Sequence, residues 1–392
     1  MKGFIYDIPT KVYFGSKVVE GNLGKELARY GKRVLLVYGG GSIRKSGLYD
    51  EVCREAREQG LEITELSGIE PNPKISSVRK GAEICKEKQI DMVLAVGGGS
   101  VIDAAKFIAA GAKIEEDPWK LVTREMKIEE ALPVITVLTL SATGSEMDGV
   151  GVISNPDTNE KLGNGAGVLR PKVSFLDPEN TYTVSRYQTA CGSADIISHI
   201  LEIYFTPDGG MYLLNRFMEG ILRTVIHYAP EAMENPENYE ARANLMWASS
   251  WAINDFAGSC SPNTWSCHAM EHELSAFYDI THGLGLAILT PAWMEYCLEK
   301  HSDTAKKFAE FTVNVFGIGS DLPEKDAAKL GIERIRTFFK ETLGLPSTLT
   351  EIGIGREHFE QMAEKACKAG GLAYAYRPLT PEDVRNIYEM CL

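Results

Sequence analysis

The sequence predicts an α/β domain with a parallel sheet, followed by an all-helical domain. In the first half, short apolar runs alternate with glycines and helical stretches, a pattern typical of a parallel sheet covered by helices. After about residue 184 these runs disappear, and long amphipathic helical patterns replace them. Because the pattern changes once, we expect two domains, an α/β domain over residues 1–184 and an all-α domain over residues 185–392.

The expected elements follow in chain order. Strands are expected at residues 34–38 (VLLVY), 61–66, 92–96 (MVLAV) and 133–140 (PVITVLTL), separated by helices at 48–59, 75–88 and 101–110. Loops and a hairpin are expected from there to about residue 177, and residues 4–14 form a β-like arm at the start. The second half contributes helices at residues 211–228, 239–256 and 303–316.

The composition excludes several classes of protein. The 392 residues are 44% hydrophobic and 24% charged, which excludes a disordered chain. A net charge of -13 repels polyphosphate backbones, so we expect no nucleic-acid partner. No run of about 20 apolar residues occurs, and residues 1–13 lack the features of a signal peptide, so we expect no membrane span. The 8 cysteines form no CxxC pair, which favours a reducing, cytoplasmic location.

Two glycine-rich turns follow predicted strands and precede predicted helices. In the second, Gly97, Gly98, Gly99 and Ser100 bring bare backbone amides and the positive end of a helix dipole to one point, where an anion is stabilised. The first turn consists of Gly39, Gly40, Gly41 and Ser42. A third strand ends near the hydroxyls of Thr139, Ser141 and Thr143. A single such turn is weak evidence, but three successive strand ends indicate a dinucleotide site.

The first turn also bears on the choice of dinucleotide. Enzymes that prefer NAD usually carry an acidic residue for the adenosine ribose hydroxyls. Here Tyr38 ends the strand, the glycines follow, and Arg44 and Lys45 come close behind, without a carboxylate in the turn. We therefore expect NADP(H) to be preferred over NAD(H). The alternative is that both basic residues are solvated surface charges and both cofactors bind.

Histidines are scarce but concentrated. Of 7 in the chain, four lie at His199, His268, His272 and His282, and Asp195 precedes His199 by one helical turn. A spacing of four residues places each of the pairs Asp195/His199 and His268/His272 on one helix face. A single buried histidine is more often a hydrogen-bonded core residue, but this cluster predicts a metal site. Imidazoles with one carboxylate suit Fe(II) or Zn(II); coordination geometry favours iron, and affinity favours zinc.

In this order, the motifs resemble the iron-containing (group III) alcohol dehydrogenase family, and within it the butanol dehydrogenase and NADPH-dependent aldehyde reductase branch. The resemblance spans nearly the whole chain. It is carried by the segments GGGSVIDAAK (97–106), TLSATGSE (139–146), DIISH (195–199) and HAMEHELSAFYDITHG (268–283).

The resemblance implies a role for specific residues. The metal ligands of the family correspond to Asp195, His199, His268 and His282, and His272 corresponds to the catalytic histidine near the nicotinamide and substrate. Lys161 falls where the family has a lysine facing the cofactor, and Gly39 to Ser42 fall at the glycine-rich turn of the NADPH-preferring branch. We also expect cofactor contacts from Asn72, in a Pro-Asn-Pro breaker, and from Asp103, whose other role would be to complement its helix N-terminus.

The reaction implied is hydride transfer between NAD(P)H and a small aldehyde, or the reverse from a primary alcohol, with a metal ion polarising the substrate oxygen. Two alternatives remain at this point. His268 to His272 formally match the HxxEH motif of a metallohydrolase, with Glu271 as general base, although this leaves the glycine-rich turns unexplained. A non-catalytic metal or nucleotide sensor of the same fold is the other. The N-terminal arm and the family resemblance favour a homodimer.

Overall fold

A computed structural model describes residues 3–206, 211–259 and 264–392. The chain forms two compact units. The sheet unit comprises residues 7–185 and 235–254, and the helical unit comprises residues 1–6, 186–234 and 255–392. Both units are thus discontinuous in sequence, whereas the ranges expected from the sequence are continuous. Within the described residues, no helix combines the length and the apolar character needed to cross a bilayer.

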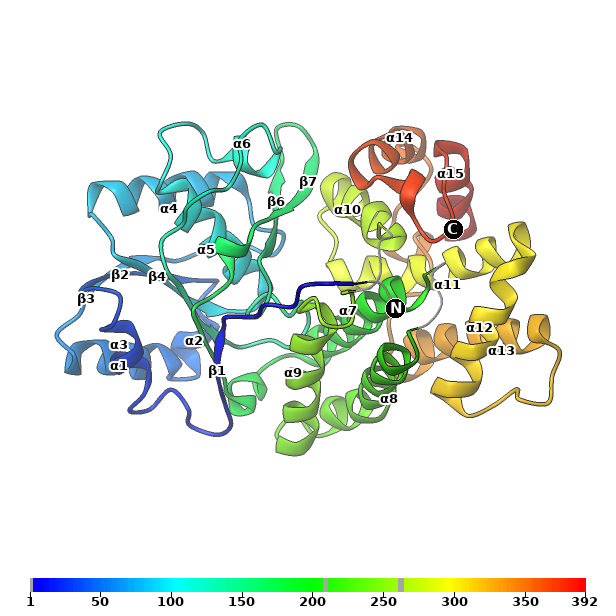
Figure 1. The fold of residues 1–392 in the computed structure, drawn as a ribbon, viewed down its shortest axis with the longest axis horizontal. Helices are drawn as coiled ribbons and strands as arrows, with labels where there is room; N and C mark the ends of the chain where they lie inside the picture. Colours follow the sequence, from blue (N-terminus) through cyan, green and yellow to red (C-terminus); the bar gives the residue numbers. More distant parts are fainter. Residues whose placement is uncertain (1–2, 207–210, 260–263) are drawn as a thin grey trace. The chain divides into compact units, whose positions relative to one another are not determined.

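The sheet unit is built on six parallel strands (Figure 1). In spatial order they are β1 (Lys11–Phe14), β8 (Val173–Leu176), β5 (Val134–Leu138), β4 (Met92–Gly97), β2 (Arg33–Tyr38) and β3 (Glu62–Leu66). In register, Tyr38 pairs with Val96, and Gly97 pairs with Leu138. The carboxyl ends of β2, β4 and β5 therefore lie side by side at one edge of the sheet, which brings the predicted dinucleotide turns together.

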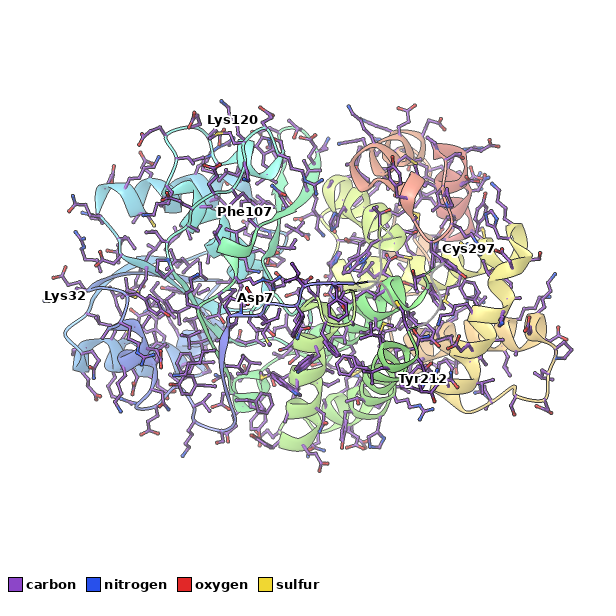
Figure 2. All side chains as sticks on the ribbon, viewed as in Figure 1. Asp7, Lys32, Phe107, Lys120, Tyr212 and Cys297 are labelled. Carbon is purple, nitrogen blue, oxygen red and sulfur yellow. The ribbon has the colours of Figure 1, made fainter. Side chains whose placement is uncertain are left out.

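Both faces of this sheet are covered by helices, as its continuous apolar strands predict. Helices α4 (Ile75–Glu87) and α5 (Gly99–Gly111) pack on the face formed by Leu35, Val37, Val93 and Ala95. Helices α1 (Leu23–Leu27) and α3 (Leu48–Glu58) pack on the opposite face, formed by Val34, Leu36, Met92 and Leu94. The alternation arises because successive side chains of a strand point to opposite faces. In Figure 2, Phe107 of α5 lies inside this unit, and Lys32 and Lys120 lie at its periphery.

Smaller elements complete the sheet unit. They are α2 (Ser42–Lys45), α6 (Trp119–Val122), an antiparallel hairpin of β6 (Val150–Asn155) and β7 (Glu160–Gly165), the 3-10 turns Gly167–Leu169 and Pro178–Thr181, and α9 (Tyr239–Ile253). Although α9 comes from the second half of the sequence, it packs in this unit. Its Met246 belongs to the α4/α5 core, and its Ser250 donates a hydrogen bond to the buried carboxyl of Glu146.

The helical unit contains no strand among its described residues. Its α-helices are α7 (Arg186–Tyr204), α8 (Tyr212–Glu234), α10 (Ser266–Tyr278), α11 (His282–Lys300), α12 (Ala305–Phe311), α13 (Glu324–Thr337), α14 (Phe359–Gly370) and α15 (Pro381–Met390). Shorter turns lie at Ser302–Thr304, Thr312–Phe316, Phe338–Thr342, Thr350–Ile352 and Leu372–Tyr374. An aromatic cluster fills part of the core, with Phe205, Trp293, Phe308 and Tyr376 in mutual ring contact. Helix α7 is buried from Thr189 to its end, so polar residues there require a specific partner.

The predicted fold class is confirmed, with local differences. The helix expected at 303–316 consists of a 3-10 turn, α12 and a π-helical turn. The expected β-like arm forms a strand only at Lys11–Phe14, where it pairs with β8.

Candidate metal centre and dinucleotide site

The candidate metal centre is built from three helices of the helical unit. Helix α7 carries Asp195 and His199 one turn apart, α10 carries His268 near its start, and α11 begins at His282. The chain reverses between α10 and α11 through Asp279, which adopts the left-handed conformation with a φ of 50°. This short reversal returns His282 to the side of α10 from which His268 projects, and the two imidazole rings lie 5.2 Å apart between centroids.

One carboxylate oxygen faces three imidazole nitrogens. The distance from Asp195 Oδ1 to Nε2 is 3.6 Å for His199, 3.8 Å for His268 and 3.7 Å for His282. Donors about 2.1 Å from a common ion at tetrahedral corners lie roughly 3.4 Å apart, so the three distances from Asp195 Oδ1 match such a ligand set to within a few tenths of an ångström. Asp195, His268 and His282 also satisfy the stricter condition that their ligand atoms all lie within 4.8 Å of one another; His199, the fourth predicted ligand, is not part of that group.

The burial of these groups supports a cation. Asp195 is 3% exposed, His199 3% and His268 6%. Among the described residues, Asp195 Oδ1 and His268 Nε2 have no hydrogen-bond partner, although a buried polar atom normally has one. A divalent ion would satisfy both. The residues present therefore fit the metal that the sequence predicts.

The pKa values of Asp195, His199 and His268 are shifted by burial and by one another's charges. Burial lowers the pKa of His199 to about 4, which favours the neutral imidazole that binds a metal. Burial also opposes the charged form of His268, but its interactions with the carboxylates of Asp195 and Glu202 outweigh that effect and raise its pKa to about 9. The pKa of Asp195 is held well below its usual range: burial opposes ionisation, and the nearby imidazoles overcome that effect. The centre thus attracts positive charge, which a bound cation supplies without protons.

Glu202 of α7 positions His268. Its Oε2 accepts a hydrogen bond from the backbone N–H of Ser266 at 2.8 Å, and its Oε1 accepts one from the N–H of His268 at 2.9 Å. The same Oε1 lies 3.3 Å from His268 Nδ1. Glu202 therefore satisfies two of the open donors at the start of α10 and fixes the ring so that Nε2 points to Asp195.

Glu271 performs the matching task for His282. It is fully buried, one carboxylate oxygen contacts His282 Nδ1, and the other accepts a hydrogen bond from Ser275. A carboxylate held in this way orients a ligand histidine and is not available as the general base of an HxxEH hydrolase. His272 lies beside the centre, with its ring centroid 5.7 Å from that of His282. Trp265 forms part of the wall, with centroids 4.7 Å from His268 and 5.4 Å from His199.

The predicted dinucleotide residues gather in the sheet unit. Gly39 to Gly41 follow β2, Gly98 precedes α5, which starts at Gly99, and Thr139 follows β5. The turns are tied together, because the backbone N–H of Thr139 donates to the carbonyl of Gly97 at 3.1 Å. Gly98, Ser100, Thr139, Ser141 and Thr143 are all partly exposed.

Close packing explains why the second turn consists of glycines. A Cβ atom on Gly99 would lie 2.2 Å from Thr143 Oγ1, and one on Gly97 would lie 2.5 Å from Val101. In contrast, Gly40 and Gly41 have no atom within 4 Å of such a position, and Gly41 has a φ of 102°. The second turn therefore needs glycines because side chains would collide with neighbouring atoms, whereas the space around Gly40 and Gly41 in the first turn is open.

Asn72 and Lys161 are brought near each other by the hairpin. The carbonyl of Pro73 accepts a hydrogen bond from the N–H of Ser154 at 2.9 Å, and Ser154 pairs with Lys161 across the hairpin. Asn72 is 7% exposed and Lys161 is 4% exposed. Both lie in the unit that carries the turns, but their contact with a cofactor stays a prediction.

Asp103 belongs to a buried network that the sequence did not reveal. Its Oδ1 accepts a hydrogen bond from Ser145 at 2.5 Å and its Oδ2 accepts one from the N–H of Val152 at 2.9 Å. Lys106, fully buried, donates to Ser145 at 2.8 Å and to Asp148 at 2.7 Å. Burial raises the pKa of Asp103 to about 6. The network fastens the hairpin to α5, so a structural role for Asp103 is evident, and a contact with the cofactor remains a prediction.

A carboxylate does lie beside the first turn, contrary to the premise drawn from the sequence. Glu65, near the end of β3, accepts a hydrogen bond from Tyr38 at 2.7 Å and from Arg44 at 2.7 Å. The sequence expectation considered only the turn itself, and Glu65 comes from the neighbouring strand.

Comparison with known proteins decides the family. The model of the iron-containing alcohol dehydrogenase family matches residues 9–178, and the model of the C-terminal domain of that family matches residues 189–392. This chain belongs to the iron-containing alcohol dehydrogenase family. It is therefore an NAD(P)-dependent alcohol and aldehyde oxidoreductase, and neither the metallohydrolase nor the sensor alternative is favoured.

Several relatives of this iron-containing alcohol dehydrogenase match over its full length. An NADH-dependent butanol dehydrogenase A of Clostridium acetobutylicum is 51% identical, with 99% of each chain covered. The NADPH-dependent aldehyde reductase YqhD of Escherichia coli is 37% identical, again with 99% of each covered. Among solved structures, an NADH-dependent butanol dehydrogenase A of Thermotoga maritima matches with a TM-score of 0.94 at 39% identity, covering 100% of this chain and 99% of that one. The family thus includes NADH- and NADPH-dependent relatives.

Three positioning residues escaped the sequence analysis. Glu202 could have been noticed as a second acid in the largely apolar α7, besides Asp195, and Lys106 as the one basic residue of the apolar α5. Glu271 was noticed only as a possible general base. Their partners lie up to 66 residues away in the chain, so sequence spacing alone gives no signal for these contacts.

Proposed function

We propose that this enzyme reduces small aliphatic aldehydes to primary alcohols, and oxidises such alcohols in reverse, at the centre formed by Asp195, His199, His268 and His282. The observation that carries the proposal is the convergence of three Nε2 atoms on Asp195 Oδ1. A divalent ion held there supplies a Lewis acid for the substrate oxygen, and the dinucleotide supplies or accepts the hydride. The butanol dehydrogenase and aldehyde reductase relatives support the substrate class.

We propose Fe(II) as the resident metal. Four protein donors nearly complete a tetrahedron, and a substrate oxygen would then be a fifth ligand, which Fe(II) accepts more readily than Zn(II). The Irving–Williams order makes Zn(II) the stronger competitor for the same site. Metal analysis of protein purified without oxygen, before and after exposure to each ion, distinguishes the two.

The remaining residues of the centre orient the histidines and exclude water. Glu202 and Glu271 hold His268 and His282 with their Nε2 atoms toward Asp195, so little reorganisation is needed when the ion binds. Trp265 covers the rings of two ligands and keeps water from that side. We assign His272 as the catalytic residue that donates the proton to the alcohol oxygen in the reduction and accepts it in the reverse reaction. An imidazole is suited to this role because it exchanges protons near neutral pH.

In the sheet unit, we propose that the turns formed by Gly97 to Ser100 and by Gly39 to Ser42 bind the phosphates and the adenosine ribose. The first residues of α5 offer backbone amides at a helix N-terminus, and Thr139, Ser141 and Thr143 add hydroxyls at the neighbouring strand end. We further assign contacts with the dinucleotide to Asn72, Asp103 and Lys161. The NADP(H) preference expected from the sequence loses its premise at Glu65, because this carboxylate pairs with Arg44 beside the first turn.

We also propose a cytoplasmic homodimer. The described cysteines are free thiols, as a reducing compartment requires, and Cys260 lies outside the described residues. Strand β1 lies at the edge of the sheet, and Phe14 is 40% exposed there, so this edge offers both hydrogen-bonding groups and apolar surface to a second copy. Light scattering on a sizing column tests the dimer, and a monomer at micromolar concentration would contradict it.

The central experiment measures the reduction of butanal with protein loaded anaerobically with Fe(II). The loss of absorbance near 340 nm should depend on metal, and Asp195→Asn should remove both the bound metal and the activity. Glu299→Gln is the matched control, because Glu299 is an exposed residue on the helix that carries His282. Full activity after the metal has been removed by a chelator would overturn the proposal.

A further inference from the structure

Four side chains form a connected cluster beside the first glycine-rich turn: Tyr38, Arg44, Tyr49 and Glu65. Glu65 Oε2 accepts hydrogen bonds from Tyr38 at 2.7 Å and from Arg44 at 2.7 Å, and its Oε1 accepts one from Tyr49 at 2.6 Å. Arg44 also donates to Tyr38 at 2.7 Å, and its guanidinium lies 3.6 Å from the centroid of the Tyr49 ring. We call these residues the Glu65 cluster.

The cluster lies at the position where a dinucleotide fold reads the adenosine ribose. Strands β2 and β3 are parallel neighbours, with Leu36 opposite Glu65. The loops after them are joined, since Gly68 N–H donates to the carbonyl of Gly39 and Ile69 N–H to that of Tyr38. Glu65 follows Gly41 by about 24 residues, near the end of the next strand, and an acidic residue about 20 residues after a glycine-rich turn is the usual partner of the ribose 2'-hydroxyl in NAD enzymes.

The charges of the cluster are balanced and accessible. Hydrogen bonds from Tyr49, and then from Tyr38 and Arg44, hold the pKa of Glu65 below its usual range, so the carboxylate is ionised at neutral pH. The side chain of Glu65 is 38% exposed and that of Arg44 is 48% exposed. The sequence indicates Arg44 as a possible partner of a 2'-phosphate. In the structure, Arg44 already forms an ion pair with Glu65.

A 2'-phosphate and a 2'-hydroxyl would meet this cluster differently. A phosphate group carries about two negative charges at neutral pH, so it would be repelled by Glu65 and would have to displace it from Arg44. A hydroxyl can donate to the free lone pairs of the same carboxylate at no electrostatic cost. The open space around Gly40 and Gly41 leaves room for the ribose at this turn.

We propose that Glu65 is the residue that sets the cofactor preference of this enzyme, in favour of NAD(H), by accepting the ribose hydroxyl and by holding Arg44 away from a 2'-phosphate. This inference rests on the proposed dinucleotide site. It reverses the preference expected from the sequence, which overlooked the strand that supplies Glu65.

Equilibrium binding tests the inference without turnover. NADH and NADPH are titrated separately into wild-type protein and into Glu65→Gln, and their fluorescence gives a Kd for each. Glutamine keeps the shape of the side chain but releases Arg44 from its ion pair. We expect the ratio of the Kd for NADPH to that for NADH to fall at least tenfold in Glu65→Gln. Adding Arg44→Met to Glu65→Gln should cancel most of the gain for NADPH, because the released guanidinium is what binds the phosphate.

Glu62→Gln is the matched control, because Glu62 is an exposed glutamate on the same strand, outside the cluster. It should leave the ratio unchanged, and thermal unfolding of all variants reports that they fold. A ratio in Glu65→Gln within twofold of the wild type overturns the inference while the dinucleotide site stands. Wild-type protein that binds neither cofactor would instead overturn the proposed function itself.

Discussion

A single methyl group at Gly283 should disable the metal centre. Gly283 follows His282 in the first turn of α11, where this helix packs against α7. A Cβ at this position would lie 2.0 Å from the carbonyl oxygen of Cys191 and 2.7 Å from its carbon, whereas ordinary contacts begin at 3.4 Å. Both atoms are backbone within a buried helix, so they cannot rotate away. The start of α11 must therefore move by about 1.4 Å in Gly283→Ala.

That displacement acts on metal binding because His282 is the adjacent residue. Its Nε2 lies 3.7 Å from Asp195 Oδ1, so a shift of this size is a large fraction of the ligand spacing. We expect a cost of about 1–3 kcal/mol in the free energy of unfolding from overpacking. Disturbing the orientation of a ligand costs roughly 10- to 100-fold in metal affinity, so we expect a loss of at least tenfold.

The assay is a titration of metal-free protein with Co(II), followed by its visible absorption bands, together with thermal unfolding. Gly220→Ala is the control, because Gly220 also lies within a helix but has no atom within 4 Å of its added methyl group. It should stabilise the protein by up to about 1 kcal/mol and leave metal binding unchanged. If Gly283→Ala bound Co(II) within twofold of the wild type, the close contact between α11 and α7 would not position His282.

Three further outcomes follow from the structure. Glu202→Gln should raise the Kd for Co(II) by about 10- to 100-fold, since the amide orients His268 less strongly, and an unchanged Kd would contradict that role. His272→Ala should lower kcat by about 100-fold or more in butanal reduction and leave metal content unchanged, whereas a loss of metal would assign it to the ligand set. Glu146→Gln tests a buried acid. Burial raises the pKa of Glu146 to about 7 from 4.5, so the folded state binds the proton more tightly than the unfolded chain. The wild type therefore loses up to about 3 kcal/mol of stability as pH rises from 4.5 to 7, and the loss persists at higher pH. Urea unfolding of the wild type and Glu146→Gln should give similar stabilities at pH 4.5 and a more stable variant at pH 8, and a parallel pH dependence would refute the account.

The sequence predicts the sheet unit well because its signals are local. Each strand from 34–38 to 133–140 is a compact apolar run, and each is followed by glycine or hydroxyl residues within a few positions. Parallel strands place all such turns at one edge, so the shared edge proposed for the dinucleotide follows from the element order alone. The helical spacing of Asp195 and His199 likewise predicts that the two side chains share one helix face, and α7 places them one turn apart.

The grouping of elements in space is harder to predict. Helix α9 looks like its neighbours in sequence, yet it packs in the sheet unit, where its Ser250 meets Glu146 more than 100 residues earlier. An amphipathic pattern says which face of a helix is buried but not which partner covers it. The two units are discontinuous in sequence because α9 belongs to the sheet unit, whereas the helices that flank it in the chain belong to the helical unit.

The residues that support the centre were missed for the same reason. Glu202 and His268 meet only because α7 and α10 lie side by side, and Glu65 meets Arg44 only because β3 pairs with β2. The sequence alone determined the fold class, the family and the set of chemical groups, because these depend on local composition, periodicity and motif spacing. Only the tertiary structure decided which carboxylate orients which histidine and which carboxylate pairs with Arg44 beside the first glycine-rich turn, because those contacts form between segments that are distant in the chain and close in the fold.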